Sequence, residues 1–333
     1  MITMKLQKSV FLFFLITFLS FSCQNEKKSA ATTESISEKK TEKEVSNKST
    51  NKIFISPLGK KLAVATPSDK MMQLYEKAKQ DFFKNSKDLE NIIWFGRRTA
   101  YLGKYEEAIN IYSDGLKTFP NEPKLYRHRG HRYISLRKFD EAIADFEKAT
   151  QLIKGKANQI EQDGLPNKLN TPISTLHGNI WYHLGLAYYL KHDFEKAFSA
   201  YQNCRNVGSN DDNIVSSTHW LFMIQSRLGN RELAIDQLKP IRDSMNIIEN
   251  HSYYQLCKFY KKMISIKEMM QDDGTPAGDA VKYGLANWHF YNGDGEQAKL
   301  DLEKILEGKA WSSFGYIAAE ADYLKYFFEE KKK

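Results

Sequence analysis

Small and large apolar residues recur along the chain at fixed distances from a repeated alanine. Beyond residue 88, five segments align on Ala108, Ala142, Ala197, Ala234 and Ala298. Twelve residues before each alanine stands a small or apolar residue, at Gly96, Gly130, Gly185, Phe222 and Ala286. Four residues after it stands a large one, at Tyr112, Phe146, Tyr201, Leu238 and Leu302. Spacings of three and four keep these positions on one helical face, so the pattern predicts pairs of helices joined by a short turn.

Most of the predicted pairs carry a small residue on both helices. We expect the small residue of the first helix to face the alanine of the second, because only small side chains let two helix axes approach closely. The large residue would then fill the space towards the next pair. One pair cannot bury its apolar face alone, so the pairs should stack. The repeats are expected near residues 89–122, 123–156, 178–211, 215–248 and 279–312.

This pattern resembles the tetratricopeptide repeat family. The resemblance is clearest in LGKYEEAI at residues 102–109 and LRKFDEAI at residues 136–143, whose alanines lie 34 residues apart, the family's period. Pro120 stands where that family usually closes a repeat. The resemblance implies an all-α, right-handed α-solenoid of stacked helix-turn-helix pairs over residues 67–328. It also implies a concave groove, lined by the first helices, that binds a partner segment without a cofactor.

The spacing departs from a regular repeat in two places. Ala142 and Ala197 lie 55 residues apart, which leaves an insertion of 21 residues beyond the 34-residue period, near 156–176. Its Gly, Pro and Asn residues predict a loop, and long ordered loops are often functional. Residues 249–278 are expected to form a degenerate helical pair. Helices at 69–84, with Ser68 as its N-cap, and at 317–327 should close the two ends of the stack.

The same spacing predicts which side chains line the groove. The candidates are Arg97, Arg127, His131, Tyr182, His219, Tyr283 and Asn287. Tyr and Arg are common at binding hot spots, and the three basic residues predict recognition of an anionic group on the partner. The alternative is that this stripe is mostly structural. Some members of the family hold a peptide carboxylate with Lys and Asn, but the Asn partners are missing here, so that activity is not expected.

The amino terminus has the pattern of an export signal. Lys5 and Lys8 precede an apolar run at residues 10–19, which is shorter than the roughly 20 residues that a membrane-spanning helix needs. The run ends in LSFSC, which resembles a bacterial lipoprotein signal of the looser kind found in Bacteroidota-like sequences. The resemblance implies removal of residues 1–22, lipid attachment at Cys23 and a place in the cell envelope, with the outer membrane favoured and the leaflet open. Ordinary secretion is the alternative.

The net charge of +8 lies mostly outside the predicted solenoid. Lys5 and Lys8 contribute two positive charges, residues 24–52 contribute two, and Lys331, Lys332 and Lys333 at the end of the basic tail (residues 329–333) contribute three. A nearly neutral body argues against nucleic acid as a partner. The segment from Cys23 to residue 66 begins with a Lys/Glu/Ser/Thr-rich stretch that cannot bury enough apolar surface to fold, so the whole segment is predicted to be a disordered tether.

Catalytic and metal-binding patterns are weak. The histidines show no metal-ligand spacing, and there is no Gly-rich phosphate loop. Cys204 and Cys257 stand among apolar residues and are expected to be buried thiols. These features predict a non-catalytic, envelope-anchored module that binds an extended or acidic segment of another envelope protein. Two alternatives stay open: a small-ligand receptor or enzyme with a pocket closed by the 156–176 loop, and an accessory lipoprotein of outer-membrane assembly.

Overall fold

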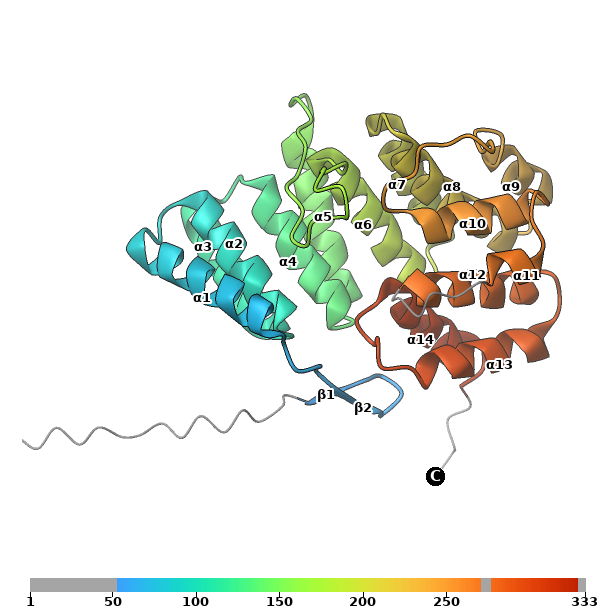
Figure 1. The fold of residues 1–333 in the computed structure, drawn as a ribbon, viewed down its shortest axis with the longest axis horizontal. Coiled ribbons are helices and arrows are strands. Elements are labelled where there is room, and N and C mark those ends of the chain that lie inside the picture. The colour runs from blue at the N-terminus through green and yellow to red at the C-terminus, as the bar shows by residue number, and fades with distance from the viewer. Residues whose placement is uncertain (1–52, 271–276, 329–333) are drawn as a thin grey trace, which may run out of the picture. The chain divides into compact units, whose positions relative to one another are not determined.

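The predicted all-α solenoid is confirmed. The computed structural model describes residues 53–270 and 277–328, and in this part of the chain fourteen helices follow one another with a single β-hairpin before them (Figure 1). The predicted signal peptide, Cys23 and the basic tail at residues 329–333 lie outside the described residues. None of the helices in the described ranges has both the length and the hydropathy to cross a membrane.

The helices form successive pairs. After α1 (Asp69–Lys84), the first three pairs are α2 (Leu89–Tyr101) with α3 (Tyr105–Thr118), α4 (Pro123–Ser135) with α5 (Phe139–Ile153), and α6 (Leu176–Leu190) with α7 (Phe194–Val207). The later pairs are α8 (Asp211–Arg227) with α9 (Arg231–Gln237), α10 (His251–Tyr260) with α11 (Ile266–Met269), and α12 (Ala277–Tyr291) with α13 (Gly295–Leu306). The chain closes with α14 (Phe314–Tyr326). Each helix from α1 to α8 contacts the next, so these pairs stack in chain order.

The small positions of the repeat make room for large aromatic side chains. A Cβ atom added at Gly96 would lie 2.3 Å from the Tyr112 ring, and one added at Gly185 would lie 2.7 Å from Tyr201. The glycine therefore opposes the large residue of its own pair, which corrects the expectation that this residue only fills space towards the next pair. The alanines are nevertheless fully buried, with exposed fractions of 0% at Ala108, Ala142 and Ala197.

Replacing Ala142 by leucine is expected to lower the free energy of unfolding by about 1–3 kcal/mol, because three added carbons overpack a fully buried position. Ala144→Leu is the matched control, since Ala144 lies on the same helix and is exposed. Urea unfolding followed by circular dichroism measures both. Equal unfolding midpoints for the two variants would show that Ala142 is not at a tight helix contact.

Residues 53–66 do not belong to the predicted tether. They form a hairpin of β1 (Ile53–Ile55) and β2 (Lys61–Ala63), paired antiparallel. Phe54 stacks on Trp311 with ring centroids 5.4 Å apart, and the Trp311 indole N–H donates to the Ala63 carbonyl at 2.8 Å. The tether boundary was wrong because this short apolar stretch finds its partner almost 250 positions further along the chain. The Ser68 cap is present, and its hydroxyl accepts the Met71 amide hydrogen bond at 3.3 Å.

The closing helix α14 does more than cover one end of the stack. It begins three residues earlier than expected, at Phe314, and packs on α6, α12 and α13. Glu320 forms an ion pair with Arg137 at 2.7 Å, and Asp322 forms one with Arg227 at 2.9 Å. These carboxylates are buried, so α14 ties together turns and helix ends from the middle of the chain.

Candidate functional site

The insertion between α5 and α6 folds back over the first helices. An isolated bridge between Ile160 and Thr175 closes its base. From α2, one guanidinium nitrogen of Arg97 donates to the Gln162 carbonyl at 2.9 Å, and one of Arg98 donates to the Gly164 carbonyl at 2.7 Å. The loop is therefore held against α2 by hydrogen bonds and forms part of the inner surface.

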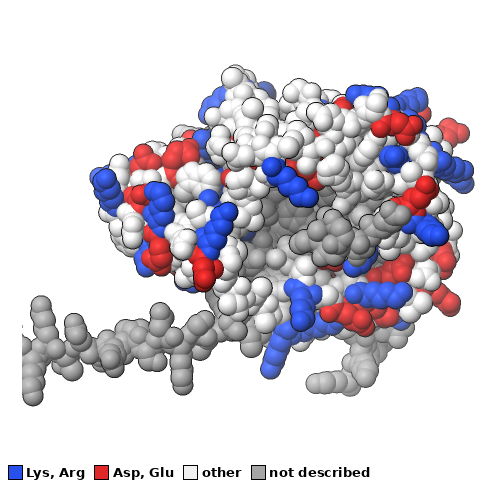
Figure 2. All heavy atoms as spheres, viewed as in Figure 1, with Lys and Arg blue, Asp and Glu red and all other residues white. Residues whose placement is uncertain are grey.

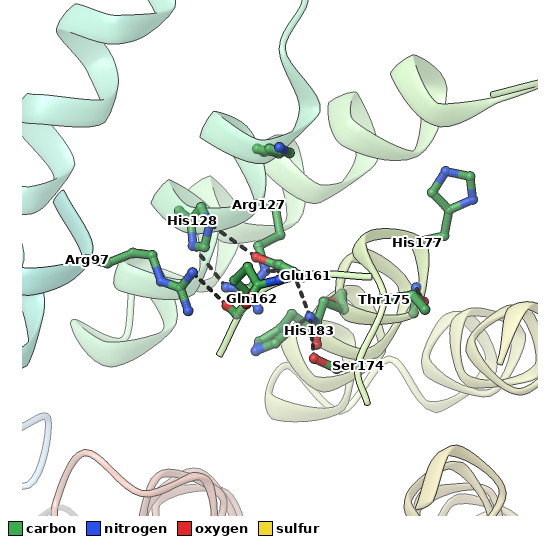
Figure 3. A network of polar contacts seen from close by, with 12 residues as sticks. Arg97, Arg127, His128, Glu161, Gln162, Ser174, Thr175, His177 and His183 are labelled. Atoms are coloured by element: carbon green, nitrogen blue, oxygen red, sulfur yellow. Dashed lines mark hydrogen bonds and ion pairs between the residues drawn. The ribbon is translucent and has the colours of Figure 1, made fainter. Parts of the chain in front are cut away.

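Glu161 anchors this loop in the fold. Figure 3 shows Glu161 beside Arg127 and His128. The Glu161 carboxylate is buried and accepts a hydrogen bond from the Asn179 amide at 2.6 Å. Arg127 Nε lies 3.2 Å and His128 Nε2 lies 3.1 Å from its two oxygens. Burial alone would raise the pKa of Glu161, but the charge of Arg127 and the contacts with His128 and Asn179 hold it well below its usual range. The glutamate is therefore ionised at neutral pH.

The state of His128 follows from its neighbours. Arg127 has only donors, so it must donate to His128 Nδ1 at 3.0 Å, which leaves the proton of the neutral ring on Nε2, facing Glu161. Burial and the nearby Arg127 charge lower the pKa of His128 to about 3. The three side chains form a buried cluster whose net charge is zero.

The predicted cationic end of the groove is not available to an anionic partner. Arg127 is occupied by Glu161, and Arg97 donates to the insertion loop and lies 4.5 Å over the Trp94 ring. His131 packs with ring centroids 4.5 Å from His183 and 5.3 Å from Phe314, and burial lowers its pKa well below the ordinary value. Glu161 could not be predicted from the repeat spacing, because it lies in the insertion, which has no equivalent in the other repeats.

Three other predicted groove residues belong to the core. His219, Tyr283 and Asn287 are each 1% exposed. The Tyr283 hydroxyl donates to Asp322 at 2.8 Å, and the Asn287 amide donates to the Tyr189 hydroxyl. Their prediction as partner-binding residues was wrong for a physical reason: α10 and α14 pack over the first helices at these positions. At these three positions the side chains are structural, as the alternative interpretation of the groove residues expected.

Tyr182 is the predicted groove residue that lines the first of two openings. With its neighbours it forms the first recess, about 330 Å³ in volume, between α6, α8, the start of α10 and the end of the insertion loop. The Tyr182 hydroxyl lies 3.1 Å from that of Tyr253 and accepts a hydrogen bond from the Trp220 indole at 2.8 Å. Other residues of its wall are Ser174, Asn179, His183, Asp212, Glu249 and Phe314.

A second recess adjoins the first. Its volume is about 600 Å³, and it lies between the inner helices and the outer half of the insertion loop, with Arg97, Arg127, Glu161, Asp163 and Lys168 in its wall. Ser174, Asn179 and Glu249 line both recesses, so the two share part of their wall. On the face drawn in Figure 2, side chains of both charge signs are mixed over the surface, so no large basic patch marks this side of the molecule.

The reactive groups near the recesses are poorly suited to catalysis. Both described cysteines are buried, as expected, and burial raises the pKa of Cys204 to about 12. Burial and the Arg127 charge lower the pKa of His183 to about 3. A thiol of such high pKa is a weak nucleophile, and an imidazole of such low pKa is a weak base at neutral pH. These groups can form hydrogen bonds, but they are not tuned for proton transfer.

Comparisons with known proteins agree with the architecture. The tetratricopeptide repeat profile matches residues 123–155, which hold α4 and α5. Among curated proteins, none matches the chain. One similar solved structure is YrrB, described as a tetratricopeptide repeat protein with an unusual peptide-binding site: 17% identity, 75% of this chain and 98% of that chain covered, TM-score 0.39.

Two further solved structures illustrate the same likeness. MamA from Desulfovibrio magneticus has 17% identity, covers 52% of this chain and 93% of its own, and has a TM-score of 0.37. The first repeat domain of Spaghetti, bound to an HSP90 peptide, has 22% identity, covers 49% and 97%, and has a TM-score of 0.31. Values this low say nothing about what the present chain binds. Residues 123–155 thus carry a tetratricopeptide repeat, and the candidate site is built on the helix pairs stacked around it.

Proposed function

We propose that this protein is a non-catalytic binding module that holds an extended segment of a partner protein in the two adjoining recesses. The observation that carries the proposal is the ordered insertion loop. The loop folds over α2, α4 and α6 and supplies wall residues to both recesses. Elsewhere, core residues fill the inner surface.

The lining of the opening suits a polypeptide. Asn179 and Ser174 stand where the two recesses meet, and the Asn179 amide nitrogen donates to Glu161 and to the Ser174 oxygen. The Asn179 side-chain oxygen can accept from a peptide backbone, and the Ser174 hydroxyl can donate to one. Tyr182, Tyr253 and Phe314 add aromatic surface in the first recess. Aromatic anchors surrounded by polar groups are the usual composition of the centre of a protein interface.

We place this module in the cell envelope. Lipid attachment at Cys23, expected from the sequence, would hold the protein at a membrane surface. Because the folded part begins at the hairpin, residues 24–52 would form the tether, and about 30 residues of flexible chain give an r.m.s. reach near 30 Å. A partner segment at the same surface, including one of an outer-membrane assembly machine, would lie within that distance.

Site-specific photo-crosslinking in intact cells tests the proposal. A photo-reactive amino acid at Lys168, which is exposed and lines the second recess, is expected to trap a partner polypeptide. Lys117 is the matched control, because it is an equally accessible lysine on α3 that lines neither recess. An adduct at position 168 and none at 117 supports the proposal. The same adducts at both positions, or none at 168, would contradict it.

A small-molecule receptor is the second candidate. The loop roofs the opening as that alternative requires, and volumes of about 330 and about 600 Å³ lie in the size range of small-ligand sites. Native mass spectrometry of protein isolated from its own cells distinguishes the two candidates. A constant added mass of a few hundred daltons that is absent from the refolded protein would favour the receptor over the peptide-binding module.

A further inference from the structure

The first recess has an unusual charge distribution. Neither lysine nor arginine is present in its wall, although the chain has 49 of these residues. Asp212 and Glu249 are the two acidic residues that line it. Asp212 is buried and accepts backbone hydrogen bonds from residues 248–250 at 2.7–2.9 Å, which fixes its carboxylate in the wall. Because both acidic side chains of the wall lack a basic neighbour within it, the wall's own side chains suit a positively charged group better than an anion.

Glu249 brings a second carboxylate to the mouth of the recess. One of its oxygens accepts a hydrogen bond from the Asn167 amide of the insertion loop at 2.6 Å. Partial burial, together with the negative charges of Asp163 and Asp212, raises its pKa above the ordinary value. A carboxylate with such neighbours gains from the arrival of a positive charge.

His183 supplies an unused hydrogen-bond acceptor. Its Nδ1 lies 2.6 Å from the Asn179 carbonyl, which can only accept, so Nδ1 carries the proton and Nε2 of the neutral ring has a free lone pair. The residue is only 5% exposed and lines the first recess, yet within the described ranges nothing hydrogen-bonds Nε2. A bound group that donates a hydrogen bond can pair with this lone pair.

The remaining wall is aromatic. The Phe314 ring centroid lies 5.6 Å from that of His183 and 6.4 Å from that of Tyr182. The faces of such rings attract cations, and the attraction is greatest where water is excluded. A group that is both positively charged and rich in N–H donors would satisfy the rings, the His183 lone pair and the carboxylates together.

We propose that the first recess binds a basic side chain, lysine or arginine, of the partner segment. The guanidinium or ammonium group donates to His183 Nε2 and lies against Tyr182 and Phe314, with Glu249 closing the mouth by charge. This assignment rests on the proposed peptide-binding function. It replaces the expectation of an acidic partner, because Arg127 is already neutralised by Glu161 and Arg97 donates to the insertion loop.

A pair of small probes tests the cation site without knowledge of the partner. n-Butylguanidinium and n-butylurea have the same shape and differ in charge. We expect the guanidinium to bind the full-length protein at least about tenfold more tightly, since charged hydrogen bonds are roughly twice as strong as neutral ones. Binding should also shift the ¹⁵N resonance of His183 Nε2, as measured by NMR, because this atom becomes a hydrogen-bond acceptor.

The Glu249→Gln variant identifies the site. Glu249 is exposed at the mouth, so its amide keeps the fold, and we expect it to weaken guanidinium binding by about fivefold or more without changing that of butylurea. Asp114→Asn is the control, since it removes one negative charge from an exposed position of α3 outside the recess. Equal effects of the two variants would mean that the protein's overall charge, not this recess, attracts the probe.

The outcomes separate this inference from the proposed function. Equal affinity for the two probes, or an unchanged His183 resonance, overturns the cation site even if crosslinking at Lys168 traps a partner. Guanidinium binding at His183 with no crosslinked polypeptide supports the cation site and removes the peptide-binding proposal. In that case a small cationic molecule is the ligand.

Discussion

The Asp322→Ala variant is expected to unfold with a free energy about 3–5 kcal/mol lower than that of the unchanged protein, because it leaves a buried positive charge without its partner. Asp322 accepts hydrogen bonds from Arg227 at 2.9 and 3.2 Å and from Tyr283 at 2.8 Å. His192 Nε2 lies 2.9 Å from the same carboxylate. The Arg227 side chain is only 2% exposed, so water cannot replace the lost carboxylate.

Two further variants make this prediction specific. Asp140→Ala removes an exposed carboxylate that pairs with Lys191 and should change the free energy of unfolding by less than about 1 kcal/mol. The double variant Asp322→Leu with Arg227→Met should recover most of the loss, because paired apolar groups leave no unbalanced charge. Urea unfolding followed by circular dichroism gives all three values. A loss below 1 kcal/mol in Asp322→Ala would show that α14 does not hold the inner helices together.

Stability is expected to fall steeply as the pH is lowered from about 6.5 towards 3, because buried histidines must take up protons on unfolding. Burial lowers the pKa values of His128, His183 and His219 to about 3 in the folded protein, compared with about 6.5 in an unfolded chain. The three rings are therefore neutral when folded, and their contribution is complete above pH 6.5. At pH 5, each of the three histidines would lower the free energy of unfolding by about 2 kcal/mol relative to pH 7.5.

The carboxylates modify this profile at lower pH. The lowered pKa of Glu161 adds stability that is complete above about pH 4.5 and is lost below it. The raised pKa values of Asp145 and Glu249 act in the opposite direction, and they do so above the ordinary values of 3.8 and 4.5. Between pH 5 and 7 the Glu161 contribution is constant, and the three histidines dominate the change in stability.

Urea midpoints at several pH values measure this dependence. His219 is the most informative histidine to replace, because its ring stacks on Tyr253 with centroids 4.6 Å apart and phenylalanine preserves that contact. His219→Phe should make the slope of unfolding free energy against pH shallower, because one proton fewer is taken up on unfolding. Equal midpoints at pH 7.5 and 5 in the unchanged protein would mean that these imidazoles are not buried in neutral form.

The sequence by itself determined the helical architecture. The small–large spacing around Ala108 and Ala142 predicted consecutive helix pairs, because local periodicity decides which face of a helix is apolar. It also predicted the insertion near 156–176, since a fixed repeat period makes any extra length visible. The Ser68 cap could be predicted for the same reason: capping depends on residues three positions apart.

Only the tertiary structure decided what the inner face presents. His219, Tyr283 and Asn287 stand at groove positions of the repeat, yet α10 and α14 bury them. Arg127 has the charge of an anion site, but Glu161, 34 residues later, neutralises it. The hairpin at residues 53–63 likewise folds because Trp311 meets it from the far end of the chain. Such contacts join residues that are far apart in the sequence and follow no fixed spacing. Burial and charge balance therefore depend on the tertiary packing and not on the local sequence pattern.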